Sequence, residues 1–248
     1  MNAVEFGSNT AETILLLHGG GLSWWNYRQE AQLLQNEFHV ILPVLDGHAG
    51  SDRAFSSVKD NAAEIISYIE EKLGGSVLLI GGLSLGGQIL LEMLSQRKDI
   101  CRCAMVESAA VIPSGLTNAL IGPAFGSSYG LIKNRSFAKM QAKSLHIGQE
   151  LFEDYYRDTC RIEKADMIAF LKASTAYSLK DALSQTQARV YVFAGEKENG
   201  TVLRSAEAVC KVIPGSKKIL LPGLYHGEFS LNRPQDYVRT LRKLIREE

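Results

Sequence analysis

The sequence has few cysteines, no excess of charge of either sign and no long hydrophobic run. Its 27 Lys and Arg residues balance 27 Asp and Glu residues, so no net field is available to attract nucleic acid or an anionic membrane surface. We therefore expect neither of these as a partner. Its 4 cysteines form no C-x-x-C pair, which argues against a disulfide framework and for reduced thiols packed in the interior.

Signals for secretion and for membrane insertion are also absent. The opening stretch MNAVEFGSNT does not place basic residues before an apolar segment, and no apolar run approaches the length that spans a bilayer. We therefore expect a cytoplasmic protein without membrane insertion. The basic stretch RTLRKLIREE near the end is typical of the solvated face of an amphipathic helix, since Val238, Leu241 and Leu244 fall on the other face.

The spacings that bind metals and nucleotides are missing as well. The histidines show no H-E-x-x-H pattern. The glycine-rich stretch at 81–87 has neither the Gly-Lys-Ser/Thr end of a phosphate loop nor the G-x-G-x-x-G of a dinucleotide site. We therefore expect no metal and no cofactor, and the sequence leaves the oligomeric state open.

The 248 residues do contain short apolar runs separated by helical patterns. One helical stretch is VKDNAAEIISYIEEKL, in which Ala62, Ile65 and Ile69 recur at helical spacing. This alternation predicts an α/β fold with a mostly parallel central sheet and helices on both faces. The apolar runs are TILLLH at 13, HVILPV at 39, SVLLIGG at 76, CRCAMVES at 101, ARVYVFAG at 188 and KKILLPG at 217.

The alternation stops between about residues 113 and 187. This segment is first rich in Gly and Ser, and then shows helical patterns around ELFEDYYRDTC and KADMIAFLKASTAY. Because strands resume after it, we expect an insertion that forms a small helical cap. We expect no boundary that divides residues 1–248 into independent domains.

The stretch GGLSLGG places Ser84 between a predicted strand and a predicted helix. A nucleophilic serine needs this sharp turn, in which flanking glycines leave room where strand and helix crowd together. The first turn of the helix adds N–H groups that favour negative charge. A serine that only caps the helix is the alternative interpretation.

A serine hydroxyl becomes a strong nucleophile only when a base takes its proton. Among the histidines, His226 follows the last predicted strand in a loop, at the sheet edge where α/β proteins bind their ligands. The base needs an acid in turn, and Glu196, Glu198 and Glu107 each end or follow a predicted strand at that edge. Serine, acid and histidine then occur in the chain order of serine hydrolases built on an α/β sheet.

Two backbone N–H groups must also hold the oxyanion of an acyl transfer. The stretch HGGG at 18–21 follows a predicted strand, and its glycine backbone can approach a substrate closely. We expect one donor from Gly20 or Gly21 and the other from Leu85, the residue after the serine. An ordinary glycine-rich loop is the alternative.

Together these segments resemble the α/β-hydrolase superfamily over most of the chain. HGGG is similar to its oxyanion loop, LDGHAGSD to its D-x-x-G-H-G-x-S-D loop, GLSLGG to its nucleophile elbow, GEKENG to its acid turn and LPGLYHGEFSLNRPQDY to its histidine loop. The resemblance implies Ser84 as nucleophile, His226 as base and Glu198 as acid, because the family acid falls three residues after the glycine of its turn.

Three features depart from the family pattern. Aspartate is the commoner acid at the turn, and Glu107 stays open as the alternative acid, because some members place it one strand earlier. In LDGHAGSD, Ala49 replaces a usual glycine, and we interpret His48 as structural. Few residues precede TILLLH, so the first strands of the usual sheet are expected to be short or missing.

The resemblance implies a serine hydrolase that cleaves a carboxylic ester or a related acyl bond of a small molecule through an acyl-enzyme. A carbon–carbon bond hydrolase or lyase with the same three residues is the enzymatic alternative, and a non-catalytic ligand-binding protein on this fold is the other. Trp24 and Trp25 after the oxyanion loop and Tyr129 in the cap are candidate pocket residues. Their rings would suit an apolar substrate, and packing in the protein interior is the alternative.

Overall fold

In the computed structural model, which describes residues 1–247 apart from the side chains of residues 127 and 128, seven strands form one sheet. Their order is β1-β3-β2-β4-β5-β6-β7, and only β1 runs antiparallel to its neighbour. The strands are β1 Ala3–Phe6, β2 Thr13–Leu17, β3 His39–Pro43, β4 Val77–Leu83, β5 Cys101–Glu107, β6 Arg189–Gly195 and β7 Lys217–Leu221. Each predicted apolar run is a strand, and the predicted fold class is confirmed.

The strand that the sequence did not predict is β1, at one edge of the sheet. It pairs with β3 from Ala3 opposite Pro43 to Phe6 opposite Val40. Its side chains are only partly buried, because an edge strand faces solvent. The residues AVEF therefore form no apolar run, and periodicity alone does not reveal them.

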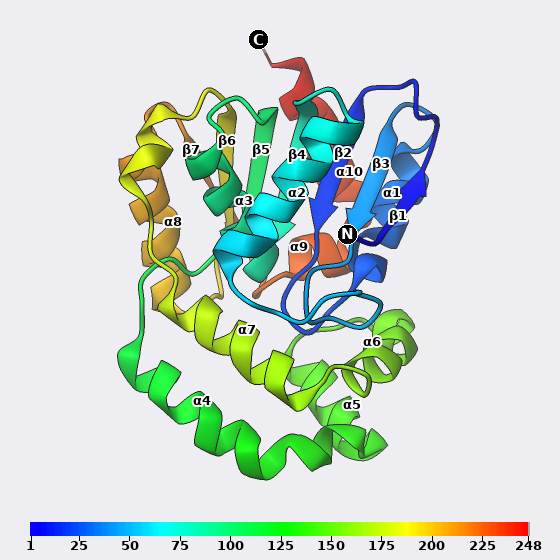
Figure 1. Ribbon diagram of the computed structural model, residues 1–248, viewed down its shortest axis with the longest axis vertical. Helices are drawn as coiled ribbons and strands as arrows, with labels where there is room; N and C mark the ends of the chain where they lie inside the picture. Colours follow the sequence, from blue (N-terminus) through cyan, green and yellow to red (C-terminus); the bar gives the residue numbers. More distant parts are fainter. Residues whose placement is uncertain (248) are drawn as a thin grey trace.

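Helices cover both faces of the sheet, because alternate side chains of a strand point to opposite faces. In β2, Leu15 and Leu17 pack with α2, α3 and α8, whereas Ile14 and Leu16 pack with α1, α9 and α10. Figure 1 shows α2, α3 and α8 in front of the sheet. The helices are α1 Arg28–Leu34, α2 Val58–Lys72, α3 Leu85–Gln96, α8 Gly200–Val212, α9 Glu228–Asn232 and α10 Pro234–Arg246.

The residues between β5 and β6 form a set of helices that Figure 1 shows beyond the carboxyl ends of the strands. The long member α4 makes its main contacts with α7 and η2 of this same segment. Its start is held by Ser114, whose N–H donates to the carbonyl of Thr175 at 3.0 Å. The elements are α4 Gly115–Ser128, η2 Tyr129–Lys133, α5 Arg135–Ser144, η3 Gln149–Leu151, α6 Phe152–Thr159, α7 Lys164–Ala176 and η4 Asp181–Gln185.

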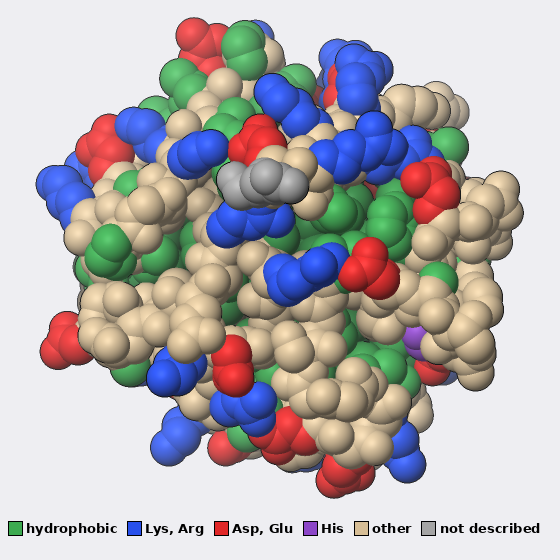
Figure 2. Space-filling view, turned by 90° about the horizontal axis from the view of Figure 1, so that it is seen from above, with side chains coloured by type: hydrophobic (Ala, Val, Ile, Leu, Met, Phe, Trp, Pro, Cys, Tyr) green, Lys and Arg blue, Asp and Glu red, His purple; other side chains and the backbone are tan. Residues whose placement is uncertain are grey.

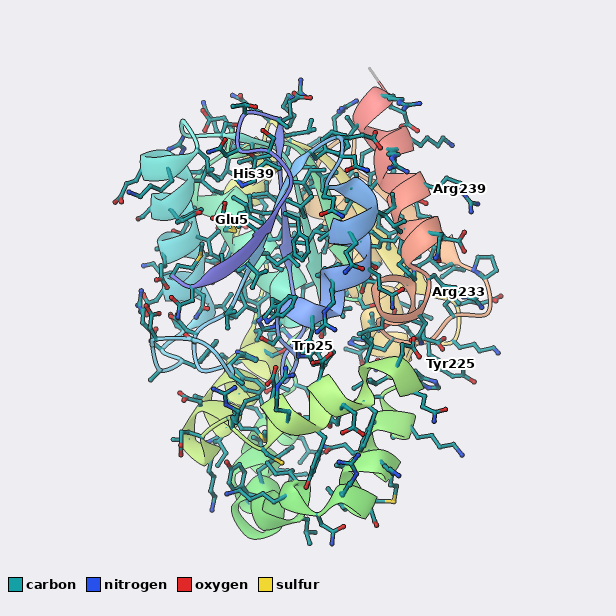
Figure 3. The ribbon with its side chains drawn as sticks, turned by 90° about the vertical axis from the view of Figure 1, so that its right-hand side faces the viewer. Glu5, Trp25, His39, Tyr225, Arg233 and Arg239 are labelled. Carbon is teal, nitrogen blue, oxygen red and sulfur yellow. The ribbon has the colours of Figure 1, made fainter. Side chains whose placement is uncertain are left out.

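Two polar contacts, one buried and one partly buried, tie α6 to the sheet layer. The indole N–H of Trp25, in the short helix η1 (Trp24–Tyr27), donates to the Asp158 carboxylate at 2.9 Å. Arg28 pairs with Asp154 at 2.8 Å. Figure 3 shows Trp25 at this junction between the sheet layer and the helices that follow β5. The two parts of the fold are therefore joined through α6.

The opposite end of the sheet carries many exposed Lys and Arg side chains (Figure 2). There α10 borders a surface hollow of about 660 Å³ with Arg239, Arg242, Lys243 and Arg246. Arg239 pairs with Asp236 and Arg242 with Glu37, so acidic neighbours balance part of this charge. The basic stretch near the end of the chain is the solvated face of an amphipathic helix. Within residues 1–247, no helix has the length and apolar character needed to cross a bilayer.

Candidate active site

Ser84 lies in the sharp turn between β4 and α3. Its backbone has φ 52° and ψ −108°, a strained conformation for a residue with a side chain. The strand and the helix approach so closely that a Cβ on Gly82 would lie 2.4 Å from the Gly86 carbonyl oxygen, and one on Gly86 would lie 2.2 Å from that of Leu17. Glycine is thus required at both positions of G-x-S-x-G, and the turn presents the serine at the carboxyl edge of the sheet.

The hydroxyl of Ser84 makes no capping hydrogen bond to α3. Its Oγ lies 3.1 Å from Nε2 of His226 instead. The alternative of a serine that only caps the helix therefore does not describe this side chain.

His226 lies in the loop between β7 and α9, where Gly227 adopts φ 72° and turns the chain. Its Nδ1 is 2.7 Å from the Glu198 carboxylate. A single tautomer satisfies both ring nitrogens: Nδ1–H donates to Glu198, and Nε2 accepts the Ser84 proton. The His226 side chain is 45% exposed, whereas that of Glu198 is fully buried. Water can reach the ring, and the carboxylate is shielded.

Glu198 follows β6 and is held by several donors. Its Oε1 accepts from the Gly195 N–H at 2.8 Å and from Ser108 Oγ at 2.7 Å. Burial alone would raise the pKa of Glu198, but the hydrogen bond and charge of His226, with these two donors, lower the pKa below its ordinary value. Glu198 is therefore kept ionised, as the partner of an imidazolium must be.

Glu107 and Glu196, the other two candidate acids, have different partners. Glu107 is buried at the end of β5, accepts the Ser230 N–H at 3.2 Å, and burial raises its pKa to about 7. Glu196 accepts the N–H of Gly223 at 2.9 Å. The carboxylate that contacts the histidine is Glu198, as the family resemblance implies. Among the described residues, no cluster of His, Cys, Asp and Glu is arranged to hold a metal ion.

Ser108 is a site residue that the sequence analysis missed. It follows Glu107 directly, adopts φ 55° and is buried. Besides donating to Glu198, its Oγ accepts the Gly227 N–H at 3.4 Å, so one hydroxyl links the acid to the histidine loop. The signal in the sequence was a polar residue at the carboxyl end of a buried strand, a position where α/β proteins place functional groups.

We expect Ser108→Ala to lower kcat about tenfold with little change in KM. Alanine keeps the Cβ and hence the backbone strain, so the change removes only the hydroxyl. A hydrogen bond to a charged group contributes about 1.5–3 kcal/mol, and Glu198 keeps its Gly195 donor, so a partial loss is expected. Steady-state kinetics on a chromogenic ester measure this loss. Ser205→Ala is the control, because Ser205 is also buried and its hydroxyl accepts the Val111 N–H at 3.0 Å instead of contacting Glu198. Equal kcat values for the two variants would remove Ser108 from the site.

The oxyanion loop offers fewer free donors than its glycines suggest. Gly19 N–H donates to the Asn26 side chain at 3.3 Å, and Gly21 N–H donates to His48 Nε2 at 3.0 Å. Among residues 1–247, the N–H groups of Gly20 and Leu85 have no acceptor. A Cβ on Gly20 would lie 3.6 Å from the Leu85 Cβ, so these two residues are adjacent. Of the two predicted glycines, the geometry favours Gly20.

The predicted pocket residues lie in three different surroundings. Trp25 was expected to line a pocket, and this expectation is corrected: its ring is fully buried, because the indole N–H is bonded to Asp158 in the protein interior. Trp24 is partly exposed, with the Arg28 guanidinium over its ring at 4.8 Å. The hydroxyl of Tyr129 donates to the carbonyl of Ile162 within the helical segment.

The sequence also matches a known family along most of its length. Residues 14–240 match the alpha/beta hydrolase family. The chain belongs to this family. Family membership supports a hydrolase, and the resemblance read from the sequence motifs is confirmed.

Solved structures of two esterases and of an enol-lactonase are similar in fold. An esterase from Exiguobacterium antarcticum superposes with a TM-score of 0.83 at 18% identity, covering 99% of this chain and 95% of that one. An esterase from Thermogutta terrifontis gives 0.79 at 17% identity, with 99% and 92% covered. An enol-lactonase from Burkholderia xenovorans gives 0.81 at 12% identity, with 99% and 96% covered. At these identities the likeness shows the alpha/beta hydrolase fold and nothing finer.

Proposed function

We propose that the chain is a serine hydrolase that cleaves carboxylic esters or related acyl bonds of a small, apolar molecule through an acyl-enzyme. The observation that carries the proposal is the unbroken line of contact from Ser84 Oγ to the His226 ring at 3.1 Å and from that ring to the Glu198 carboxylate at 2.7 Å. This is the arrangement of a nucleophile, its base and the group that orients the base.

In the proposed reaction, His226 Nε2 takes the Ser84 proton as Oγ attacks the acyl carbon. Glu198 stabilises the imidazolium that forms, and the N–H groups of Gly20 and Leu85 hold the oxyanion. His226 then protonates the departing alcohol, which leaves the acyl group on Ser84. Water, deprotonated by the same histidine, attacks this ester and releases the acid.

The names of the similar solved structures favour cleavage of an acyl–oxygen bond over cleavage of a carbon–carbon bond. The similar solved structures include esterases and an enol-lactonase, and a lactone is a cyclic ester. We extend that bond type to this chain as part of the proposal, since the same three residues serve either chemistry.

We also propose that residues 113–187 act as a cap on a single domain and shape the substrate pocket. The supporting contact is made by Phe170 of α7: a Cβ on Gly20 would lie 3.5 Å from its ring. A helix of the segment therefore lies against the oxyanion loop, where an acyl group would bind. Apolar walls at this place suit an apolar acyl chain.

The proposal is tested by reacting the wild-type protein with a fluorophosphonate and by assaying a panel of nitrophenyl esters, acyl thioesters and β-diketones. We expect covalent labelling that peptide mapping assigns to Ser84, because only an activated serine attacks phosphorus at a useful rate. We also expect kcat/KM for the best ester to exceed that for the best diketone by tenfold or more.

The two alternatives give different results. Faster turnover of a diketone would support the carbon–carbon bond hydrolase. Absence of both labelling and turnover would overturn the enzyme proposal in favour of a ligand-binding protein.

A further inference from the structure

The loop that follows β3 contains a buried histidine with no part in the proposed proton transfer. His48 uses both of its ring nitrogens: Nε2 lies 3.0 Å from Gly21 N, and Nδ1 lies 2.9 Å from the carbonyl oxygen of Asp46. A backbone N–H can only donate, so Nε2 is the acceptor and the proton sits on Nδ1. Burial lowers the pKa of His48 to about 4, so the ring is neutral at neutral pH and keeps this acceptor.

The contact with His48 fixes one peptide plane of the oxyanion loop. Gly21 has φ 77°, and its N–H points to the histidine, so the Gly20 carbonyl points the opposite way. A flip of this peptide would exchange the two groups and bring a carbonyl oxygen toward the place of the N–H. Glycine resists such a flip weakly, so an external acceptor is needed to select one orientation.

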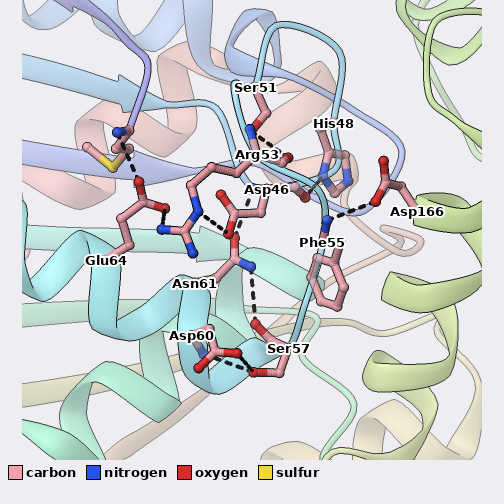
Figure 4. A network of polar contacts seen from close by, with 11 residues as sticks. Asp46, His48, Ser51, Arg53, Phe55, Ser57, Asp60, Asn61, Glu64 and Asp166 are labelled. Atoms are coloured by element: carbon pink, nitrogen blue, oxygen red, sulfur yellow. Dashed lines mark hydrogen bonds and ion pairs between the residues drawn. The ribbon is translucent and has the colours of Figure 1, made fainter.

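Two aromatic rings hold His48 in turn. Phe170 of α7 stacks on it with centroids 4.5 Å apart and an interplanar angle of 22°. His18, which begins the oxyanion loop, meets it edge-on at 4.9 Å. Next to Phe170, Asp166 of α7 accepts the Phe55 N–H at 2.8 Å, and Figure 4 shows Asp166 beside His48 and its loop. Helix α7 therefore holds both the loop and the ring.

We propose that His48 is a positioning residue of the oxyanion hole: by holding the Gly20–Gly21 peptide it restricts rotation about the Gly20 backbone, so that the Gly20 N–H, which lies in the preceding peptide, keeps its orientation for the oxyanion. Phe170 keeps the His48 ring in place. The inference rests on the proposed function. It also gives the helical segment a role in transition-state stabilisation besides forming a pocket wall. No step of the reaction passes through His48 itself.

The test compares two substitutions that separate the acceptor from the ring. His48→Phe keeps a ring against Phe170 but removes the acceptor. His48→Gln loses the ring but keeps an acceptor, because the amide oxygen of glutamine is as many bonds from Cβ as Nε2 is in histidine. Loss of one oxyanion donor costs about 10²–10³ in kcat, so we expect His48→Phe to lower kcat about 10- to 100-fold. KM should stay within about threefold, and His48→Gln should recover most of the loss.

A transition-state analogue gives a readout that general loosening of the fold would not mimic. A trifluoromethyl ketone adds to Ser84 and places its oxyanion in the hole, so its inhibition constant should rise in His48→Phe by the same factor as kcat/KM falls. His39 of β3 provides the matched control, since it is also buried. Its Nε2 lies 2.7 Å from the carboxylate of Glu5 on β1, away from the site (Figure 3). His39→Phe should leave kcat and the inhibition constant unchanged.

Nuclear magnetic resonance tests the inference on the wild-type protein, and a substitution is used only to assign the signal. Two-bond proton–nitrogen correlations at pH 7 should show His48 with the proton on Nδ1 and an unprotonated Nε2, the signal being assigned by its absence in His48→Gln. A proton on Nε2, equal losses in the two His48 variants, or a kcat within twofold of wild type in His48→Phe would each overturn the inference. None of these results affects the proposed nucleophile, which is tested separately by labelling of the wild-type protein and by the turnover of Ser84→Ala.

Discussion

Replacing Ser84 with alanine is expected to lower kcat for the best ester substrate about 10⁵-fold and to abolish fluorophosphonate labelling. In serine hydrolases, loss of the nucleophile removes the covalent route altogether, and what remains comes from the oxyanion donors and binding. Alanine retains the Cβ, so the φ of 52° at this turn is no more strained than with serine. The variant should therefore fold and bind substrate with a KM close to that of wild type.

The measurement is steady-state hydrolysis with the wild-type protein and two variants in parallel. Ser95→Ala is the control, because Ser95 lies on the same helix α3 and its hydroxyl donates to the Glu92 carbonyl at 2.7 Å. It should keep full activity. If Ser84→Ala retained more than about a hundredth of the wild-type rate, set against the expected size of the loss, the covalent mechanism would have to be abandoned.

The second large effect is expected from a pair of glutamates near His226. Glu198→Gln should lower kcat about 10³- to 10⁴-fold, because an amide in place of the orienting carboxylate favours the wrong tautomer and gives no charge to stabilise the imidazolium. Glu107→Gln should lower kcat less than tenfold. Its carboxyl contacts the Ser230 N–H, and its pKa of about 7 leaves it largely protonated below neutral pH.

The two glutamine variants are each other's control, since both carboxyl groups are buried and both substitutions preserve shape. Circular dichroism and the thermal unfolding midpoint establish that each is folded. The reverse order of activities would assign the orienting acid to Glu107. Equal small losses would mean that His226 needs no buried carboxylate.

The predictable part of the fold was the part encoded by local pattern. Buried parallel strands form continuous apolar runs because both of their faces are covered, so the five strands β2 to β6 could be found from sequence, and the exposed edge strand β7 was found because it still carries the run ILL. Strand β1 could not be found, because it is only four residues long and the exposed Glu5 interrupts its apolar residues.

The site divides in the same way. Ser84 and His226 were predictable because each follows a recognisable strand end. The family resemblance was needed to separate Glu198 from Glu196, and Glu107 stayed open until the contact between Glu198 and His226 was seen. The hydrogen bonds from Ser108 to Glu198 and from Gly21 to His48 were not predictable, since each joins segments far apart in the chain. Trp25 was misjudged for the same reason: Asp158, its partner, is 133 residues away.

Helix α4 packs mainly against α7 and η2 of its own segment, whereas the sheet and its loops hold the reacting groups. Because α4 and the reacting groups are held by different parts of the fold, we expect them to differ in how much change they tolerate. We expect substitutions in α4 to leave the chemistry intact, because the main contacts of this helix run to α7 and η2, whereas Ser84, His226 and Glu198 contact one another and the loops of the sheet. We expect descendants of this chain to diverge fastest there, and directed evolution toward bulkier acyl groups to accumulate its first successful changes in the same helix.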